Sequence, residues 1–281
     1  MAADMMYTAL AGLNTFNTAL TVVSDNIANA NTTGFKSSTV DFGDIVSGLI
    51  ATPNASNSVA EGAGSSVLGV ETNFSTGSEI QTGTWSDLMI QGGGFFAVEN
   101  PSTSQISYTR DGSFEISSVT AGGSTNSYLT DMNGNEVLDS TGAAIQIADP
   151  STYSSFSVSQ SGIITGITAA ATTVGGVTTP AGTAVQIDTN PIGITTFPNQ
   201  NGLVRVGEND YTANANSGVG TAQAPGAGQA GTITAGAVEG SNVDLTQQMV
   251  NLIDYQADYQ ANSKSITTDN TDLQTVVNLI R

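Results

Sequence analysis

Both ends of the chain carry apolar residues at the spacing of a helix that packs against a partner. Near the N-terminus they recur in alternating steps of three and four, the heptad pattern of a coiled coil. These residues are Met6, Ala9, Leu13, Phe16, Leu20, Val23, Ile27 and Ala30. Near the C-terminus the apolar or aromatic residue of each heptad is Leu245, Leu252, Tyr259, Ile266, Leu273 or Ile280. The companion positions there are mostly polar: Met249, Gln256, Ser263, Asn270 and Val277. A stripe this narrow cannot hold a lone helix in water, so each helix needs the other terminus or another subunit as its partner.

The residues at the ends of these segments predict where the helices begin and end. Asp4 is placed to cap the first helix, and Gly34 to close it in a left-handed conformation. Ser241 and Asp244 form a weak capping box ahead of the second helix.

Between the helices the sequence changes to short strands. Residues 37–70 are rich in Ser, Gly, Ala and Asn, and we expect them to be irregular. Strand patterns separated by turn formers then occupy 66–74, 87–100, 105–117, 143–148, 183–189 and 202–213. The predicted fold class is α+β, with long N- and C-terminal α-helices forming a coiled-coil-like terminal domain around an all-β central body. The predicted domains are the N-terminal helix 1–36, the irregular linker 37–70, the β-rich body 71–235 and the C-terminal helix 236–281.

The composition excludes several classes of function. The chain contains no cysteine and no histidine, so disulfides, thiolate metal sites and Ser-His-Asp catalysis are ruled out. With 24 acidic and 5 basic residues the net charge is −19, which disfavours nucleic acids and anionic membrane surfaces as partners. We see neither a basic n-region nor an apolar run of about 20 residues, so we expect no membrane insertion and no cleaved signal peptide.

Three motifs could carry chemistry, and each has a simpler structural interpretation. Residues 131–139, DMNGNEVLD, resemble a calcium loop, but the glycine is at the fourth position, so we expect a hairpin turn on Asn133-Gly134. The glycines of QGGGFF (91–96) lack phosphate-loop spacing and favour a tight turn before two buried phenylalanines. Asp111 and Glu115 could form a glycosidase pair, but a turn with a local Arg110–Asp111 ion pair is simpler. We therefore expect no catalytic, cofactor-binding or metal-binding residues and no enzyme activity.

Four separated motifs resemble the axial proteins of the bacterial flagellar rod and hook. ALAGLNTFNTALTVVSDNIANANTTGFKSSTVDFGDI is similar to the N-terminal signature of this family, and MIQGGGFFAVEN with YTRDGSFEI to its first β-domain. NGLVRVGENDYTANANSG and GAVEGSNVDLTQQMVNLIDYQADYQANSKSI resemble its C-terminal third. For residues 117–196 we identify no resemblance.

Within the family, the chain is most similar to the hook protein, with the distal rod protein as the alternative. GFKSSTVDFGDI, YQANSKSI and the ending NLIR favour the hook, whereas the chain has no room for the additional outer domain of a hook protein. The family motif QRxYxAN reads QADYQAN at residues 256–262, without its arginine.

The resemblance implies a mechanical function. As a hook, the subunits would polymerise helically into a tubular universal joint that transmits torque from rod to filament and encloses the export channel. The implied partners are further copies of the chain, the distal rod protein, the hook cap, the hook–filament junction proteins, the hook-length ruler and the type III export apparatus. The implied location is the hook–basal body on the extracellular side of the cell envelope, after export without a cleaved leader.

In this interpretation the helix seams are the assembly interface, and the asparagine-rich segment is the exit from the inner tube. The amides of Asn26, Asn29 and Asn31 can bond the backbone or neighbouring subunits where the helix stops. Gly34 permits the turn and Phe35 anchors the chain against the next layer.

Other functions remain open at this point. The seams could instead be an ordinary intramolecular core, and the chain could be a secreted adhesin or surface-layer β-protein. An acidic glycosidase is the enzymatic alternative.

Overall fold

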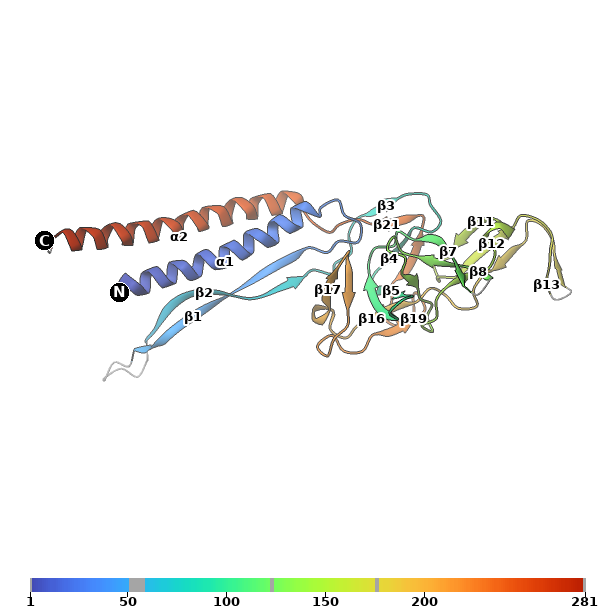
Figure 1. The fold of residues 1–281 in the computed structure, drawn as a ribbon, viewed down its shortest axis with the longest axis horizontal. Helices are drawn as coiled ribbons and strands as arrows, with labels where there is room; N and C mark the ends of the chain where they lie inside the picture. Colours follow the sequence, from blue (N-terminus) through green and yellow to red (C-terminus); the bar gives the residue numbers. More distant parts are fainter. Residues whose placement is uncertain (1, 51–58, 122–123, 175–176, 280–281) are drawn as a thin grey trace. The chain divides into compact units, whose positions relative to one another are not determined.

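The structure is a computed structural model that describes residues 2–50, 59–121, 124–174 and 177–279 (Figure 1). Within these residues one long helix precedes an all-β body in the sequence and a second long helix follows it, which confirms the predicted α+β class. The chain divides into two compact units. The helix–hairpin unit comprises Met1–Ala30, Ser37–Asn73 and Val243–Arg281, and the β-body comprises Asn31–Lys36 and Phe74–Asn242.

The helix–hairpin unit contains helices α1 (Ala2–Ala28) and α2 (Leu245–Leu279) and strands β1 (Ser38–Ile50) and β2 (Val59–Thr72). The prediction that residues 37–70 are irregular is wrong, because β1 and β2 pair antiparallel from Ser38↔Thr72 to Ile50↔Val59. Register shifts between Asp41 and Phe42 and between Ile45 and Val46 interrupt this ladder. Such bulges break the two-residue alternation by which a strand is detected in sequence.

The helix ends also differ from the predictions. Helix α1 begins at Ala2, so Asp4 lies inside it, and it ends at Ala28, well before Gly34. Helix α2 is capped by Asp244 rather than by Ser241: the Asp244 carboxylate accepts the backbone N–H groups of Thr246 and Gln247 at 2.9 and 3.2 Å. Neither helix in the described part of the chain has the length and hydropathy of a membrane span.

The β-body is organised around one large sheet in which the order of the strands differs from their order in the sequence. Among the described residues this sheet has ten strands in the order β10-β8-β9-β5-β6-β18-β17, with β7 beside β8 and with β16 joining β5 to β19. Its strands are β5 (Phe95–Asn100), β6 (Gln105–Thr109), β7 (Glu115–Ala121), β8 (Ser124–Thr130), β9 (Glu136–Val137), β10 (Gln146–Ile147), β16 (Ile194–Thr196), β17 (Val204–Gly207), β18 (Asp210–Thr212) and β19 (Thr221–Gln223).

Smaller sheets complete the body. They are β3 (Glu79–Gln81) with β21 (Ala237–Glu239), β4 (Leu88–Gln91) with β20 (Thr232–Ala235), β11 (Tyr153–Val158) with β12 (Ile164–Thr168) and β15 (Ala184–Gln186), and β13 (Thr172–Val174) with β14 (Val177–Thr179). All of the windows in which strand patterns were recognised overlap at least one of the observed strands.

Strand β5 separates the two hydrophobic cores of the body. Because successive side chains point to opposite faces of a strand, Phe96 enters the main aliphatic core while Phe95 packs with Phe197 and Tyr211. Gly92 and Gly94 precede this pair with φ of 116° and 110°, in the region that favours glycine. The interpretation of QGGGFF as a tight turn before buried aromatics is therefore confirmed.

Candidate assembly site

The most buried face of α1 is a stripe of small and polar side chains, offset from the predicted apolar stripe. Its buried residues are Ala9, Gly12, Thr15, Ala19, Val23 and Asn26. Of the predicted seam residues, Ala9 and Val23 belong to this stripe, and the flanking positions Leu13, Phe16, Leu20 and Ile27 are half-buried. Small residues at the centre of a helix contact let the two backbones approach closely.

Helix α2 lies antiparallel to α1, as three contacts show. The Asn26 amide Nδ2 donates to Gln248 Oε1 at 3.3 Å, the Phe16 and Tyr255 rings lie 6.2 Å apart, and a Cβ at Gly12 would come within 3.0 Å of the Asn262 amide. As the residue number falls along α1, the number of its partner on α2 rises. The two termini are therefore partners within one chain.

The companion positions on α2 are shifted by one residue from those predicted. Gln248, Tyr255 and Asn262 face α1, whereas Met249 and Val277 are 49% and 60% exposed. The facing residues Gln248 and Asn262 are polar, so hydrophobicity alone could not identify them. Leu252 and Ile266, two of the predicted assembly residues, are half-buried beside this polar line.

The β1–β2 hairpin packs on the same helix pair. Phe42 of β1 completes a three-ring cluster, with ring centroids 6.0 Å from Phe16 and 6.1 Å from Tyr255. The Thr15 hydroxyl donates to the Ser65 carbonyl of β2 at 3.0 Å. A Cβ at Gly64 would lie 3.0 Å from the Ala11 methyl group, which indicates a close approach of β2 to the helix.

Much apolar surface is exposed among the described residues of this unit. Three predicted assembly residues are exposed, namely Leu245 (43%), Tyr259 (39%) and Leu273 (45%), while Ile280 lies outside the described residues. Other large exposed hydrophobic residues are Met5, Met6, Tyr7, Leu10, Val46, Leu68, Val70, Val250, Ile253, Val276 and Leu279. Apolar surface of this extent marks interaction sites in soluble proteins.

The asparagine side chains after α1 bond mainly to nearby backbone. Asn26 accepts the Ser38 N–H at 2.9 Å and donates to the Ser38 carbonyl at 2.7 Å, which ties the end of the helix to the start of β1. The Asn29 amide donates to the Asp25 carbonyl at 2.9 Å, and Asn31 is exposed. A role of these amides towards neighbouring subunits stays a prediction.

Gly34 and Phe35 belong to the β-body. Gly34 has a φ of 68° and donates its N–H to the Glu239 carbonyl at 2.8 Å, and a Cβ there would lie 2.5 Å from the Asp111 nitrogen. The Phe35 ring is buried beneath the guanidinium of Arg205, 4.9 Å from its centroid. Glycine is required at position 34 by both the left-handed backbone and the lack of space.

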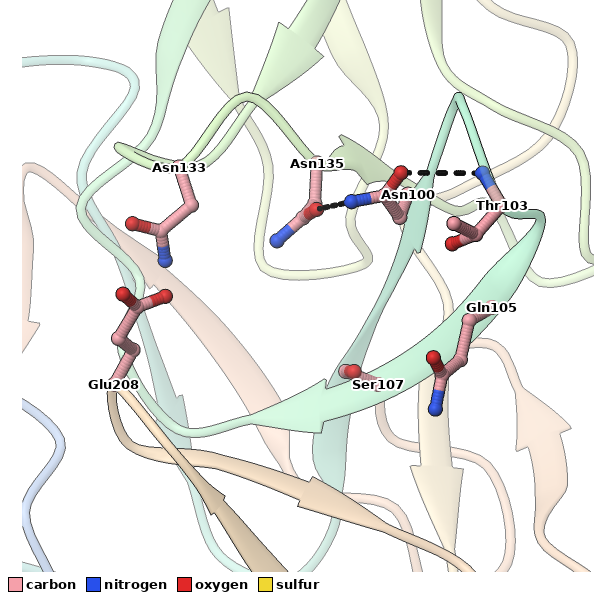
Figure 2. Close-up of a pocket in the computed structure, with 7 residues that line it drawn as sticks. All are labelled: Asn100, Thr103, Gln105, Ser107, Asn133, Asn135 and Glu208. Atoms are coloured by element: carbon pink, nitrogen blue, oxygen red, sulfur yellow. Dashed lines mark hydrogen bonds between the residues drawn. The ribbon is translucent and has the colours of Figure 1, made fainter.

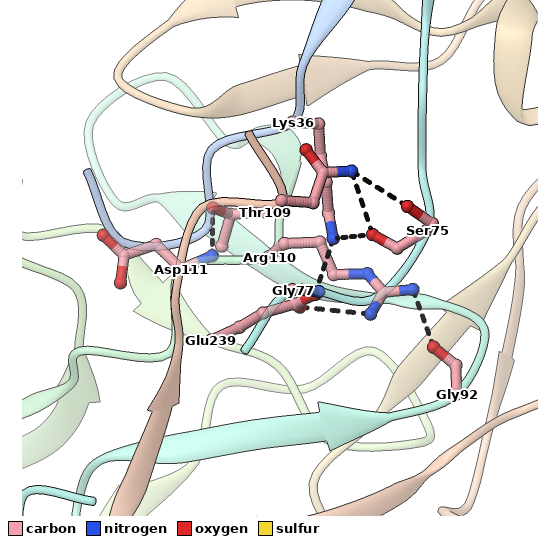
Figure 3. A network of polar contacts seen from close by, with 9 residues as sticks. Lys36, Ser75, Gly77, Gly92, Thr109, Arg110, Asp111 and Glu239 are labelled. Carbon is pink, nitrogen blue, oxygen red and sulfur yellow. Dashed lines mark hydrogen bonds and ion pairs between the residues drawn. The ribbon is translucent and has the colours of Figure 1, made fainter. Parts of the chain in front are cut away.

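A buried ionic network lies where the chain enters and leaves the β-body (Figure 3). Lys36 Nζ contacts Glu239 Oε1 at 2.6 Å, and Arg110 Nη1 contacts Glu239 Oε2 at 3.3 Å, with side chains that are 0–1% exposed. Lys36 also donates to the Ser75 carbonyl at 2.8 Å, Arg110 to the Gly92 carbonyl at 2.9 Å, and the Gly77 N–H to Glu239 at 2.7 Å. This ionic network joins segments that are distant in the sequence.

Burial opposes the charges of Lys36 and Arg110, and Glu239 offsets this only in part. Burial lowers the pKa of Lys36 and of Arg110, while the Glu239 carboxylate acts in the opposite direction on both. The predicted local Arg110–Asp111 ion pair is wrong, because the Arg110 side chain turns to Glu239. Sequence reasoning missed Lys36, Arg110 and Glu239 as a set, although two basic residues in so acidic a chain were a signal.

In two of the motifs that could carry chemistry, the aspartate carboxylates accept structural hydrogen bonds. The Asp131 carboxylate accepts the N–H groups of Asn133 and Asn135, both at 2.8 Å, and Gly134 has a φ of 82°, as the hairpin interpretation predicted. Asp111 accepts the Thr33 hydroxyl at 3.1 Å, and Glu115 is exposed on β7. Within the described residues no group of three or more His, Cys, Asp or Glu side chains could hold a metal ion.

A polar pocket lies on the β-body (Figure 2). It encloses about 410 Å³ and is lined by Asn100, Thr103, Gln105, Ser107, Asn133, Asn135 and Glu208. Asn133 and Glu208 point toward one another across it, and Asn100 donates to Asn135 at 3.2 Å. None of the lining residues is a typical nucleophile paired with a base.

Comparison with known families gives three matches along the chain. Residues 6–36 match the flagella basal body rod protein family, residues 89–166 match the flagellar hook protein FlgE/F/G D1 domain, and residues 234–279 match the flagellar basal body rod FlgEFG protein C-terminal family. The D1 match includes part of the segment 117–196, for which sequence analysis found no resemblance.

Among curated relatives, the flagellar basal-body rod protein FlgG of Bacillus subtilis is 37% identical over 98% of both chains. FlgG of Borreliella burgdorferi is 30% identical over 98% of both chains. The flagellar hook protein FlgE of Treponema pallidum is 36% identical over 126 residues, which cover 45% of this chain and 24% of that protein.

Proposed function

Because the chain belongs to the family of flagellar basal-body rod and hook proteins, we propose that it is the structural subunit of the distal rod. Members of this family are structural proteins of the flagellum, and the chain is not an enzyme. The observation that carries the rod assignment is the full-length match to FlgG, which leaves neither chain with a large unmatched domain.

This proposal reverses the preference drawn from the motifs. The hook protein match leaves three quarters of that protein uncovered, since it spans 24% of it. Single motifs such as YQANSKSI favour the hook, but each covers only a few residues. Motifs shared by the whole family cannot separate its members, whereas the arrangement of domains can.

The helix–hairpin unit supports a polymer in which many copies cover one another's apolar surface. A heterologous contact that does not close produces a helical filament. The exposed Leu245, Tyr259 and Leu273 are the residues through which we propose that subunits meet. In a rod such a polymer would act as a drive shaft that passes torque to the hook.

Partners and location follow from the same proposal. The partners are further copies of this chain and the hook protein above them, and the subunit reaches its place through the type III export apparatus. The hook cap, the junction proteins and the length ruler were inferred from the hook assignment and are not carried over.

Immunoelectron microscopy of hook–basal bodies isolated from the source bacterium tests the assignment. Antibodies against the β-body should label the shaft below the hook. Label along the curved hook would contradict the rod proposal and restore the first preference. Straight tubes grown from purified subunits would agree with the rod, and curved tubes with the hook.

A further inference from the structure

Three turns of the β-body bring four carboxylates to one place. Asp111 follows β6, Asp131 follows β8, and Glu208 and Asp210 lie at the β17–β18 turn. These residues line a small cavity of about 30 Å³ together with Thr109, Ser113, Met132 and Asn133. We call these four carboxylates the acidic junction.

Asp210 is a buried carboxylate of the acidic junction. It is 8% exposed and pairs with Thr109 in the β18–β6 ladder. Burial, followed by the charge of Asp131 and then those of Glu208 and Asp111, raises the pKa of Asp210 to about 6, against an opposing hydrogen bond from Thr109. The neighbouring cation Arg110 is directed elsewhere, to Glu239.

The same turns hold the segment through which the chain enters the β-body. Asn209 of the β17–β18 turn donates its Nδ2 to the Thr33 carbonyl at 2.8 Å, and the Thr33 hydroxyl donates to Asp111 Oδ2 at 3.1 Å. Glu208 and Asn209 both adopt positive φ, 55° and 62°. Repulsion within the acidic junction therefore acts on the strained β17–β18 turn, which is hydrogen-bonded to Thr33.

Solvent reaches the acidic junction through the neighbouring polar pocket. Asn133 and Glu208 line both cavities, and Glu208 stands at the edge of the open pocket (Figure 2). Protons can exchange with the junction without unfolding of the body.

We propose that the acidic junction is a pH-sensitive latch on residues 31–36. When Asp210 is neutral, the three turns close on Thr33, and when it is ionised, the β17–β18 turn loosens and Thr33 is held less firmly. A carboxyl group whose affinity for a proton is higher in the folded state stabilises the fold as the pH falls. The latch is a property of the β-body and holds for a rod or a hook subunit alike.

Hydrogen exchange of the full chain, followed by mass spectrometry of peptides that cover residues 31–36 and 204–212, tests this proposal. After correction for the intrinsic exchange rate, protection of both peptides should be about tenfold higher at about pH 5 than at about pH 7.5. The Asp210→Asn variant should show the higher protection at both values. The exposed Glu115→Gln is the matched control and should behave as the unaltered chain.

Glu208→Gln provides an independent variant, because Glu208 is exposed and its replacement removes one repelling charge without changing Asp210. It should reduce the pH dependence, and by less than Asp210→Asn does, because the charge of Glu208 contributes less than burial and Asp131. Equal protection at both pH values in the unaltered chain, or an unchanged pH dependence in Asp210→Asn, would overturn the latch. Neither result would bear on the assignment to the rod.

Discussion

Lys36 and Glu239 are separated by 203 positions in the sequence, yet Lys36 Nζ lies 2.6 Å from Glu239 Oε1 in a site closed to solvent. Lys36 follows the N-terminal helix and Glu239 precedes the C-terminal one. The pair therefore holds the incoming and outgoing segments of the β-body together. A second contact joins the same two segments: the Gly34 N–H donates to the Glu239 carbonyl at 2.8 Å.

Substitutions of different members of the ionic network should destabilise the β-body by different amounts. Glu239→Gln leaves two buried cations facing each other and should cost about 3–5 kcal/mol, whereas Lys36→Met leaves the Arg110 pair and should cost about 2–3 kcal/mol. Urea unfolding followed by the fluorescence of Trp85, the only tryptophan, reports on the body. Lys264→Met, on an exposed part of α2, is the control and should change stability by less than about 0.5 kcal/mol. A smaller loss in Glu239→Gln than in Lys36→Met would refute this ranking.

Asp139 should stabilise the body at neutral pH and lose this effect in acid. Burial alone would raise its pKa, but hydrogen bonds from Ala143, Thr141 and Asn190 outweigh it and hold the pKa of Asp139 below its usual 3.8. A depressed pKa contributes stability above the unfolded value, and this contribution is lost as the pH falls below about 3.8. Asp139→Asn should therefore cost roughly 1–3 kcal/mol at about pH 7 and much less at about pH 2.

Urea titrations of the unaltered chain and of Asp139→Asn at the two pH values measure this difference, since other titrating groups contribute equally to each. A cost of Asp139→Asn that does not change with pH would show that the lost bonds are not those of the ionised carboxylate.

Asp210→Asn should act in the opposite direction, because the pKa of Asp210 is raised to about 6. Its folded-state pKa above the unfolded value means that the ionised carboxylate destabilises the fold above about pH 6.

A charge placed on the exposed apolar face of α2 should prevent assembly without unfolding the chain. Leu273 is 45% exposed, so Leu273→Glu should leave the monomer intact and reduce polymer yield by about tenfold or more. Electron microscopy and sedimentation of the polymer measure the yield, and circular dichroism checks the helices. Gln274→Glu adds the same charge at the adjacent exposed position and should have a weaker effect. Equal losses would indicate that charge, and not apolar contact, limits assembly.

Salt should promote polymerisation. The net charge is −19, from 24 acidic and 5 basic residues, so neighbouring subunits repel one another in a polymer. Raising the ionic strength from about 10 mM to about 1 M shortens the Debye length from about 30 to about 3 Å and should increase the yield of polymer. Sedimentation across this range measures the effect. A constant yield would mean that subunit contacts are not opposed by their charge.

Periodic patterns proved sufficient to identify both helices, the all-β body and the buried pair Phe95 and Phe96, because each depends on local spacing. The β1–β2 hairpin was missed because its bulges interrupt the alternation. The face of α1 was misplaced by one stripe because Gly12 and Ala19, which permit the closest contact with α2, carry no hydrophobic signal.

What the sequence by itself determined was therefore the type and order of the elements and the absence of catalytic chemistry based on histidine or cysteine. Only the tertiary structure decided which residues meet. Gln248 accepts a hydrogen bond from Asn26, Glu239 pairs with Lys36 and Arg110, and Asp210 lies beside Asp131. Such polar contacts depend on segments far apart in the chain and on burial, which strengthens electrostatic interactions, and neither is encoded in local periodicity.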